Sequence, residues 1–151
     1  MKIMLAVLAA ICAPAAIMIA WYLYGQFATF EASDPYIWVR TRNFAILCLL
    51  VSALYVVVLG LPTYLLLRWR RAIRWWYALL RGLVVAGLPL AIFAWPLRYA
   101  ALGSSASVDG VATMINGVPT TAGWVQYLSG IAQIGVLGMV GGFAFWLVQR
   151  K

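Results

Sequence analysis

Four long apolar segments restrict what this chain can fold into. A helix that crosses a bilayer needs about 20 predominantly apolar residues, and four stretches reach that length, at about 3–24, 43–67, 76–99 and 124–148. Only 9% of the residues are charged and 66% are apolar, whereas about a quarter of the residues in a soluble domain are charged. The sequence therefore predicts an all-α membrane protein, a four-helix up-down bundle that forms a single domain over residues 1–151.

The first apolar segment has some features of a secretory signal peptide, because Lys2 precedes it and small residues lie inside it. Its apolar run continues to Tyr24, which is long for a signal core. We therefore expect an uncleaved first helix. Pro14 is expected to bend it, which a bundle tolerates when neighbouring helices satisfy the freed backbone groups.

Arginines and tryptophans alternate in the stretch RWRRAIRWW, which begins at residue 68. A short loop rich in Lys and Arg stays in the cytoplasm, so the turn at about 68–75 predicts that both chain ends lie inside. Lys2, Arg150 and Lys151 agree with this orientation. The residues expected to set the topology and to contact lipid headgroups are Arg68, Arg70, Arg71 and Arg74.

The net charge of +8 would by itself permit nucleic-acid binding. Here, however, four of the cations lie beside or between tryptophans, which collect at membrane interfaces. We therefore expect the lipid bilayer, and no nucleic acid, as the partner of this basic turn. Short cytoplasmic arginine clusters of this kind favour a multi-pass protein of a bacterial inner membrane.

The first outer loop is expected at about 25–42. It holds two of the three acids and several aromatic residues. The aromatics either lie along the membrane interface or form a partner-binding surface, since aromatics and Arg are enriched in interface cores. The candidate partner-binding residues of this loop are Glu31, Asp34, Tyr36, Trp38 and Arg40.

The second outer loop, at about 100–123, is the only long polar region. Asp109-Gly110 and Asn116-Gly117 are both hairpin-turn dipeptides, and the stretch VATMI between them has strand character. We predict a small extracytoplasmic β-hairpin or meander, with VATMI paired to VPTT. An isolated hairpin is marginally stable in water, so it must rest on the first loop, on helix ends or on a partner. Asp109 and Asn116 are its candidate partner-binding residues.

Catalytic chemistry has few candidate groups in this chain. Histidine is absent, which removes the commonest general base and transition-metal ligand. Cys12 and Cys48 lie in apolar runs, and the three acids fall outside the apolar segments, whereas membrane enzymes and ion-coupled carriers normally show intramembrane ionisable residues. We predict no catalytic residues, no metal and no cofactor, and thus no enzyme.

Two arginines lie near the ends of the third apolar segment. Arg81 is one turn from the inner end and Arg98 is at the outer end. Both are long enough to reach an interface. The alternative for Arg81 is that it caps an internal polar site.

Two patterns share the fourth segment. Gln126, Ser129 and Gln133 form a polar stripe that we expect to face other helices, because an unpaired amide in lipid is costly. Gly135, Gly138 and Gly142 lie within roughly 60° of one another, which allows close backbone approach. This glycine face packs inside the bundle, with the alanine-rich first helix as the expected partner, or forms a homo-oligomer seam, or docks another subunit.

Two function classes remain open. The first is a non-enzymatic protein whose outer loops bind an extracytoplasmic or membrane-embedded protein, such as an immunity protein that neutralises a toxin. The second is a structural or assembly subunit of a transporter, secretion or respiratory complex, acting through the fourth helix. A small channel or carrier is a third class, and the polar stripe of the fourth helix would have to form its path.

Overall fold

Helices make up most of this computed structural model, which describes residues 2–30, 34–69, 75–99 and 103–150. The described helical elements are α1 (Lys2–Thr29), α2 (Tyr36–Tyr55), the π-helical segment η1 (Val56–Gly60), α3 (Leu61–Trp69), α4 (Trp75–Phe93), the 3-10 segment η2 (Pro96–Tyr99) and α5 (Thr121–Arg150). Helices α2, η1 and α3 follow one another without a break. In the described residues, four helices are long and apolar enough to cross a membrane: Lys2–Thr29, Tyr36–Leu65, Trp75–Phe93 and Thr121–Arg150. The prediction of four apolar helices is thus confirmed.

The helices extend beyond the apolar runs, and this corrects the expected loop at 25–42. Helix α1 continues to Thr29 and α2 already begins at Tyr36. Hydropathy reports which residues suit lipid, whereas a helix continues as long as its backbone hydrogen bonds are formed. Asp34 and Pro35 start α2, because a carboxylate oxygen of Asp34 accepts the Tyr36 N–H at 2.9 Å and proline is pre-organised for a first helical turn.

The second membrane-length helix widens at η1. The Leu61 N–H donates to the carbonyl of Val56, five residues earlier. Pro62 explains the wide turn, because a proline has no N–H and its ring clashes with the carbonyl four residues before it. Thr63 Oγ1 then donates to the carbonyl oxygens of Leu59 and Gly60, at 2.6 and 2.9 Å. The local π geometry therefore keeps the helix continuous past a proline.

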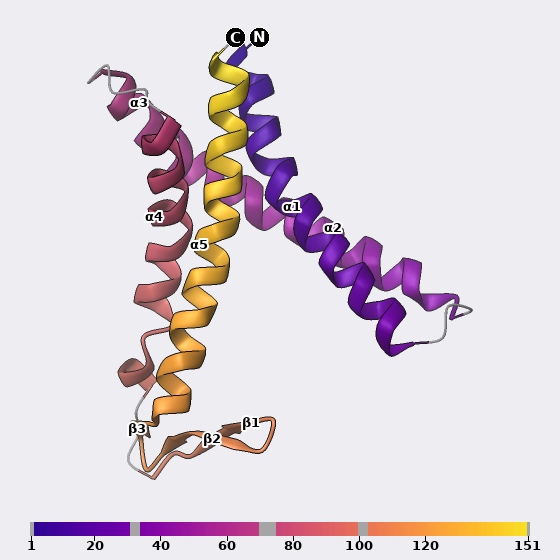
Figure 1. Cartoon of the computed structure of the whole chain (residues 1–151), viewed down its shortest axis with the longest axis vertical. Coiled ribbons are helices and arrows are strands. Elements are labelled where there is room, and N and C mark those ends of the chain that lie inside the picture. Colours follow the sequence, from indigo (N-terminus) through magenta and orange to yellow (C-terminus); the bar gives the residue numbers. More distant parts are fainter. Residues whose placement is uncertain (1, 31–33, 70–74, 100–102, 151) are drawn as a thin grey trace.

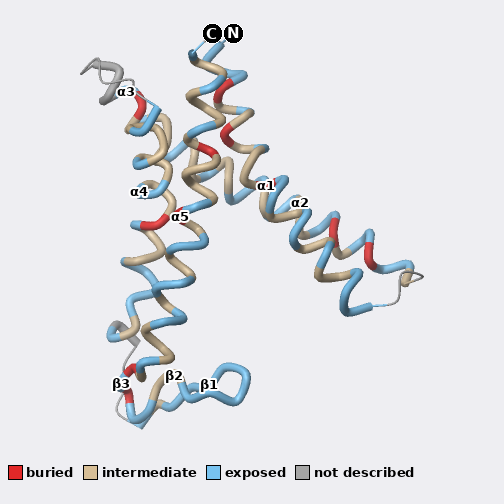
Figure 2. Tube along the Cα trace, viewed as in Figure 1, coloured by how far each residue is buried: buried red, intermediate tan, exposed pale blue. Residues whose placement is uncertain are grey.

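Figure 1 shows two arms that meet near the chain termini. Helices α4 and α5 run side by side as one arm. Helix α1 runs beside α5 at the end that carries the termini and then diverges with α2 as the second arm. The end of α3 and the start of α4 also lie toward the end with the termini, whereas the end of α1 and the start of α2 lie away from it. Few residues are buried in the isolated chain (Figure 2), so most of the apolar helix surface is open to its surroundings.

The glycine face of α5 packs on α4. A Cβ atom at Gly138 would overlap the backbone of Gly82, and one at Gly142 would overlap the carbonyl of Ala78. The expectation that this face meets the first helix is wrong, because α4 presents its own small residues, Ala78, Gly82 and Ala86, at four-residue spacing. The first helix instead meets the neighbouring Gly141, through Ala10 and Pro14.

Three short antiparallel strands form a meander before α5. They are β1 (Ala106–Val108), β2 (Val111–Ile115) and β3 (Val118–Pro119), in the order β1-β2-β3. Both turns have two residues with positive φ, at 51° and 78° for Asp109-Gly110 and at 50° and 80° for Asn116-Gly117. Positive φ at both central residues defines the type I′ hairpin turn. The small β-element and the pairing of VATMI with the following strand are confirmed.

The meander rests on the start of α5. A Cβ at Gly123 would overlap the Thr113 carbonyl, so β2 and the first turn of α5 are in direct backbone contact. Thr120 joins the two elements, because its Oγ1 donates to the Ala112 carbonyl at 2.7 Å and accepts the Gly123 N–H at 3.2 Å. The sequence allowed three supports for the sheet: the first loop, helix ends or a partner. In the structure, the sheet packs on a helix end, the start of α5.

An aromatic cluster fixes the same end of α5 to the end of α4. Trp95 lies edge-on to Trp124 and Tyr127, with ring centroids 5.5 and 5.9 Å apart. The Tyr127 hydroxyl donates to the Ala91 carbonyl at 2.7 Å. The sheet is therefore attached to a rigid helix pair rather than to a loop.

Candidate functional site

Side chains near the end of α1 contact side chains near the start of α2. Asp34 and Arg40 form an ion pair with a distance of 3.2 Å. The Arg40 guanidinium also lies 4.5 Å from the ring centroid of Phe30 and 3.4 Å from Gln26 Oε1. Asp34 and Arg40 therefore hold this helix hairpin together, and Glu31 lies outside the described residues.

Two other candidates from the expected first loop lie on the first turns of α2. Tyr36 and Trp38 are both exposed. Trp38 contacts Phe27 of α1 edge-on, with 6.3 Å between ring centroids. Their exposed faces remain free in the isolated chain, for lipid or for a partner.

Asp109 and Asn116 occupy the positive-φ positions of the two hairpin turns. Their structural role is to reverse the chain, because Asn and Asp tolerate this backbone region better than most residues. Figure 1 shows the sheet and the α1–α2 connection on separate arms. The structure therefore does not bring the candidates of the two expected loops together.

The sheet carries two exposed apolar pairs. Val108 pairs with Val111 across β1–β2, and Ile115 pairs with Val118 across β2–β3. Partners in an antiparallel pair point to the same face. The pairing register shifts within β1, and such a bulge interrupts the alternation of side chains along the strand. The four side chains therefore form two separate pairs, with exposed fractions of 43 and 55% in the first and 51 and 64% in the second.

The other side of the β2–β3 pair is directed inward. Met114 pairs with Pro119, which is buried. The sequence analysis named the turn residues of this element and missed the four apolar ones. The signal was the β-branched Val111 and Ile115 within VATMI, since such residues are typical of a strand.

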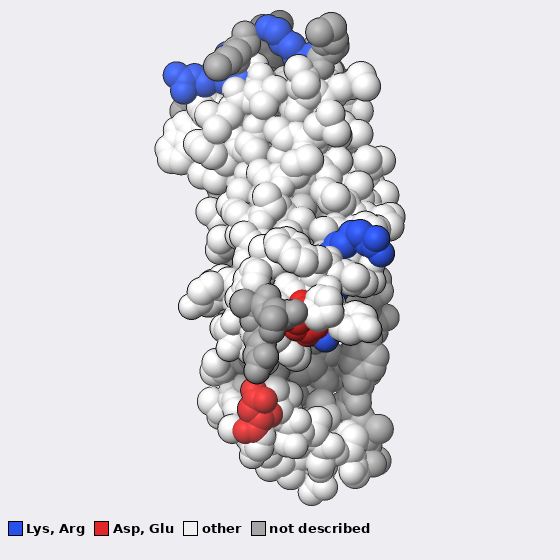
Figure 3. All heavy atoms as spheres, turned by 90° about the vertical axis from the view of Figure 1, so that its right-hand side faces the viewer, with Lys and Arg blue, Asp and Glu red and all other residues white. Residues whose placement is uncertain are grey.

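The basic turn is only partly described. Arg68 lies in α3, whereas Arg70, Arg71 and Arg74 fall outside the described residues. Figure 3 shows Lys and Arg at one end of the molecule, an uncharged surface below them, and both basic and acidic side chains farther down. This face thus has a basic end that uncharged surface separates from a region of mixed charge.

The polar stripe of α5 is exposed in the described part of the isolated chain. Gln126, Ser129 and Gln133 are all exposed, so the described residues do not cover the side chains that were expected to face other helices. The stripe lies on another side of α5 from the glycines, since five residues separate Gln133 from Gly138 and correspond to about 140°. The α1–α2 arm has diverged from this part of α5 (Figure 1), so it does not cover the stripe.

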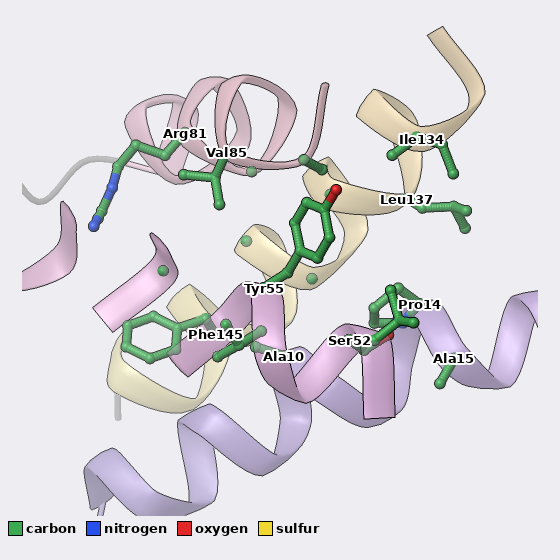
Figure 4. A pocket seen from close by; sticks show the side chains of 18 of the residues that line it. Ala10, Pro14, Ala15, Ser52, Tyr55, Arg81, Val85, Ile134, Leu137 and Phe145 are labelled. Atoms are coloured by element: carbon green, nitrogen blue, oxygen red, sulfur yellow. The ribbon is translucent and has the colours of Figure 1, made fainter. Parts of the chain in front are cut away.

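A cavity of about 350 Å³ lies where the two arms meet. Helices α1, α2, α4 and α5 all contribute to its lining, together with η1 and α3. Figure 4 shows Val85, Leu137 and Phe145 among the side chains around it, with Tyr55 reaching between α4 and α5. Its volume falls in the range of about 300–1,000 Å³ that is typical of ligand pockets.

Polar groups gather at one end of this cavity. Arg81 lies at its rim, and its guanidinium carbon is 5.9 Å from the ring centroid of Tyr64. The Tyr64 hydroxyl donates to Gln149 Oε1 at 2.9 Å. The Gln149 Nε2 atom is buried and has no hydrogen-bond partner among the described residues. The sequence left open whether Arg81 snorkels or caps a polar site, and the structure places it beside this polar cluster.

The cavity combines an apolar interior with one cation, Arg81, a combination suited to binding. In the described part of the chain, no group of three or more His, Cys, Asp or Glu is placed to hold a metal ion. Cys48 lines the cavity as a free thiol among apolar neighbours. Comparisons with protein families, with curated proteins and with solved structures find no match to this chain.

Proposed function

We propose that this chain is a non-enzymatic, multi-pass membrane protein that binds a protein partner through its β-sheet. In this proposal both termini and the basic turn are cytoplasmic, in a bacterial inner membrane, and the sheet is extracytoplasmic. Three features support the orientation. The turn is rich in arginine, both termini have basic residues nearby, and the helix ends that flank the turn lie toward the same end of the molecule as the termini (Figure 1).

The exposed apolar pairs of the sheet carry the proposal. Val108, Val111, Ile115 and Val118 lie outside the membrane-length helices. Apolar side chains exposed together on a small polar segment are typical of an interaction site. Strand β1 is also an edge strand, which offers backbone groups for an added strand from a partner.

The form of partner binding that we propose is immunity, in which the sheet captures a toxin that acts from outside or within the membrane. A rigid support suits this role, because a preorganised surface loses less entropy on binding. The contacts of Gly123 with Thr113 and of Trp95 with Trp124 supply that support.

Quantitative affinity purification tests the proposal. Tagged chain is extracted in mild detergent from its native host, and co-purifying proteins are compared for the parent and for Val111→Lys with Ile115→Lys. The matched control is Ala112→Lys, because Ala112 is also exposed but belongs to neither apolar pair. A partner lost only from the double variant is expected. Equal recovery from all three proteins would exclude the apolar pairs as the binding surface.

A second function is favoured by the polar stripe of α5. Gln126, Ser129 and Gln133 are exposed on a helix of membrane-spanning length, and an amide without a partner in lipid is unfavourable. Contact with a helix of another membrane subunit would satisfy these groups. The alternative proposal is therefore a structural or assembly subunit of a larger membrane complex.

A further inference from the structure

The cavity between the two arms is mainly apolar. Its lining is mostly alanine, valine, leucine, isoleucine and aromatic side chains, and all its lining elements belong to membrane-length helices or to the π segment within one. Along α4 the lining runs from Ala78 to Leu90, which corresponds to about 18 Å of helix. A site of this shape and composition suits an extended hydrocarbon chain.

The cation at its rim lacks an anionic partner within the described chain. Two acids are described. Asp34 pairs with Arg40, and Asp109 forms a sheet turn on the other arm. Among the described residues, the Arg81 guanidinium lies over the ring of Tyr64 in a cation–π contact. A guanidinium is always charged in proteins and has five N–H donors, so most of its hydrogen-bonding capacity is available to a ligand.

A second donor lies beside the same cluster, although Gln149 itself does not line the cavity. Gln149 Oε1 accepts from the Tyr64 hydroxyl, while Gln149 Nε2 is buried and has no hydrogen-bond partner among the described residues. Buried polar groups are almost always hydrogen-bonded, and an unsatisfied one requires an explanation. An anionic group bound near Tyr64 would bring acceptor oxygens close to this donor.

The position of Arg81 indicates where such an anion comes from. Arg81 is six residues from the start of α4 at Trp75, or about 9 Å along the helix. That end of α4 follows the basic turn. A lipid headgroup at that interface would reach Arg81 while its acyl chain entered the apolar cavity.

We propose that this cavity binds one anionic phospholipid of the surrounding bilayer, with its phosphate on Arg81 and an acyl chain among the apolar residues. The site is separate from the sheet surface, so it does not depend on the proposed partner. Arg81 provides charge-assisted hydrogen bonds, which are roughly twice as strong as neutral ones. The apolar lining of the cavity provides the affinity for the acyl chain of the lipid.

Native mass spectrometry tests the lipid site. The protein is reconstituted with equal amounts of phosphatidylglycerol and phosphatidylcholine, released, and examined for retained lipid. We expect one retained phosphatidylglycerol per chain, preferred about tenfold over phosphatidylcholine, as one or two charge-assisted hydrogen bonds would give. Equal retention of the two lipids, or retention of a free fatty acid in place of a phospholipid, would overturn the assignment.

Two matched pairs of variants locate the site. Arg81→Gln should abolish the preference for the anionic lipid, while Arg150→Gln, at the same end of the molecule but outside the cavity lining, should retain it. Val85→Phe should reduce retention of both lipids at least tenfold by filling the cavity. The neighbouring Val84→Phe should retain them, because Val84 is exposed.

Far-UV circular dichroism and a single elution peak establish that each variant is folded. Where Val85→Phe fails this check, Ser52→Phe fills the same cavity from α2 and should likewise reduce retention of both lipids. Arg81→Lys keeps the charge and should keep most of the anionic preference. Unchanged lipid retention in folded Arg81→Gln and in a folded cavity-filling variant would contradict the proposal.

Discussion

The Tyr64 hydroxyl donates a hydrogen bond of 2.9 Å to Gln149 Oε1. This bond joins α3 to the last turn of α5, across 85 positions of the chain. Phe145 packs edge-on against the same ring at 4.8 Å between centroids. Tyr64 is also buried, so one side chain connects the second membrane-length helix to the fourth beside the lipid cavity.

Replacement of Tyr64 by Phe should lower the stability of the bundle. The variant keeps the ring contact and removes the hydroxyl, which leaves both ends of the Gln149 amide without a partner. The cost should be about 1–3 kcal/mol, as expected for a buried polar group that loses its hydrogen bond. The free energy of unfolding in detergent measures it. Tyr24→Phe is the matched control, because Tyr24 is exposed, and an equal effect of both changes would argue against the bond.

Gly138→Leu should prevent α4 and α5 from packing. Overfilling a close contact typically costs about 1–3 kcal/mol, and here the added atoms meet backbone at Gly82, which has little room to move. Gly130→Leu is the control, since the space beside Gly130 is open. Thermal unfolding of both variants measures the difference. A Gly138→Leu protein as stable as the Gly130→Leu protein would contradict the observed helix contact.

Gln133→Leu separates the two proposed functions. The side chain is exposed, so the stability of the isolated chain should change by less than about 0.5 kcal/mol. Under the subunit alternative, co-purification of other membrane subunits should fall, and blue-native electrophoresis would show a smaller complex. If a partner binds through the sheet, the amount of that partner recovered by co-purification should not change in this variant.

Substitutions in the basic turn test the proposed orientation of the chain in the membrane. Neutral replacement of Arg68, Arg70, Arg71 and Arg74 should give chains of mixed orientation, because the Lys and Arg bias of short loops sets topology. Reporter fusions at both termini measure the fraction of each orientation. Unchanged orientation in the variant would remove the turn as the determinant of topology.

The helices and the sheet turns could be predicted from local sequence. Apolar length marks the four long helices, and Asn116-Gly117 requires positive φ at both positions, which few dipeptides allow. The start of α2 was missed because Asp34 and Pro35 act through backbone hydrogen bonds and a fixed φ. Hydropathy does not report either effect.

The candidate site depended on contacts that local patterns do not determine. Gln133 matched an internal stripe in the sequence, yet its exposure depends on the divergence of the α1–α2 arm (Figure 1). The partner of Gly138 depended on which other helix offers a small face. The cluster of Arg81, Tyr64 and Gln149 joins three helices, and no single stretch of sequence contains it.

The most direct measurement of the central claim is site-specific photo-crosslinking in intact cells of the native host. A photoreactive side chain is placed at Val111, in an exposed apolar pair, or at Ala112, on the opposite face of the same strand. The account predicts a defined protein adduct at Val111 and little or none at Ala112. Adducts with lipid alone at Val111, or the same protein adduct at both positions, would show that the sheet face does not bind a partner.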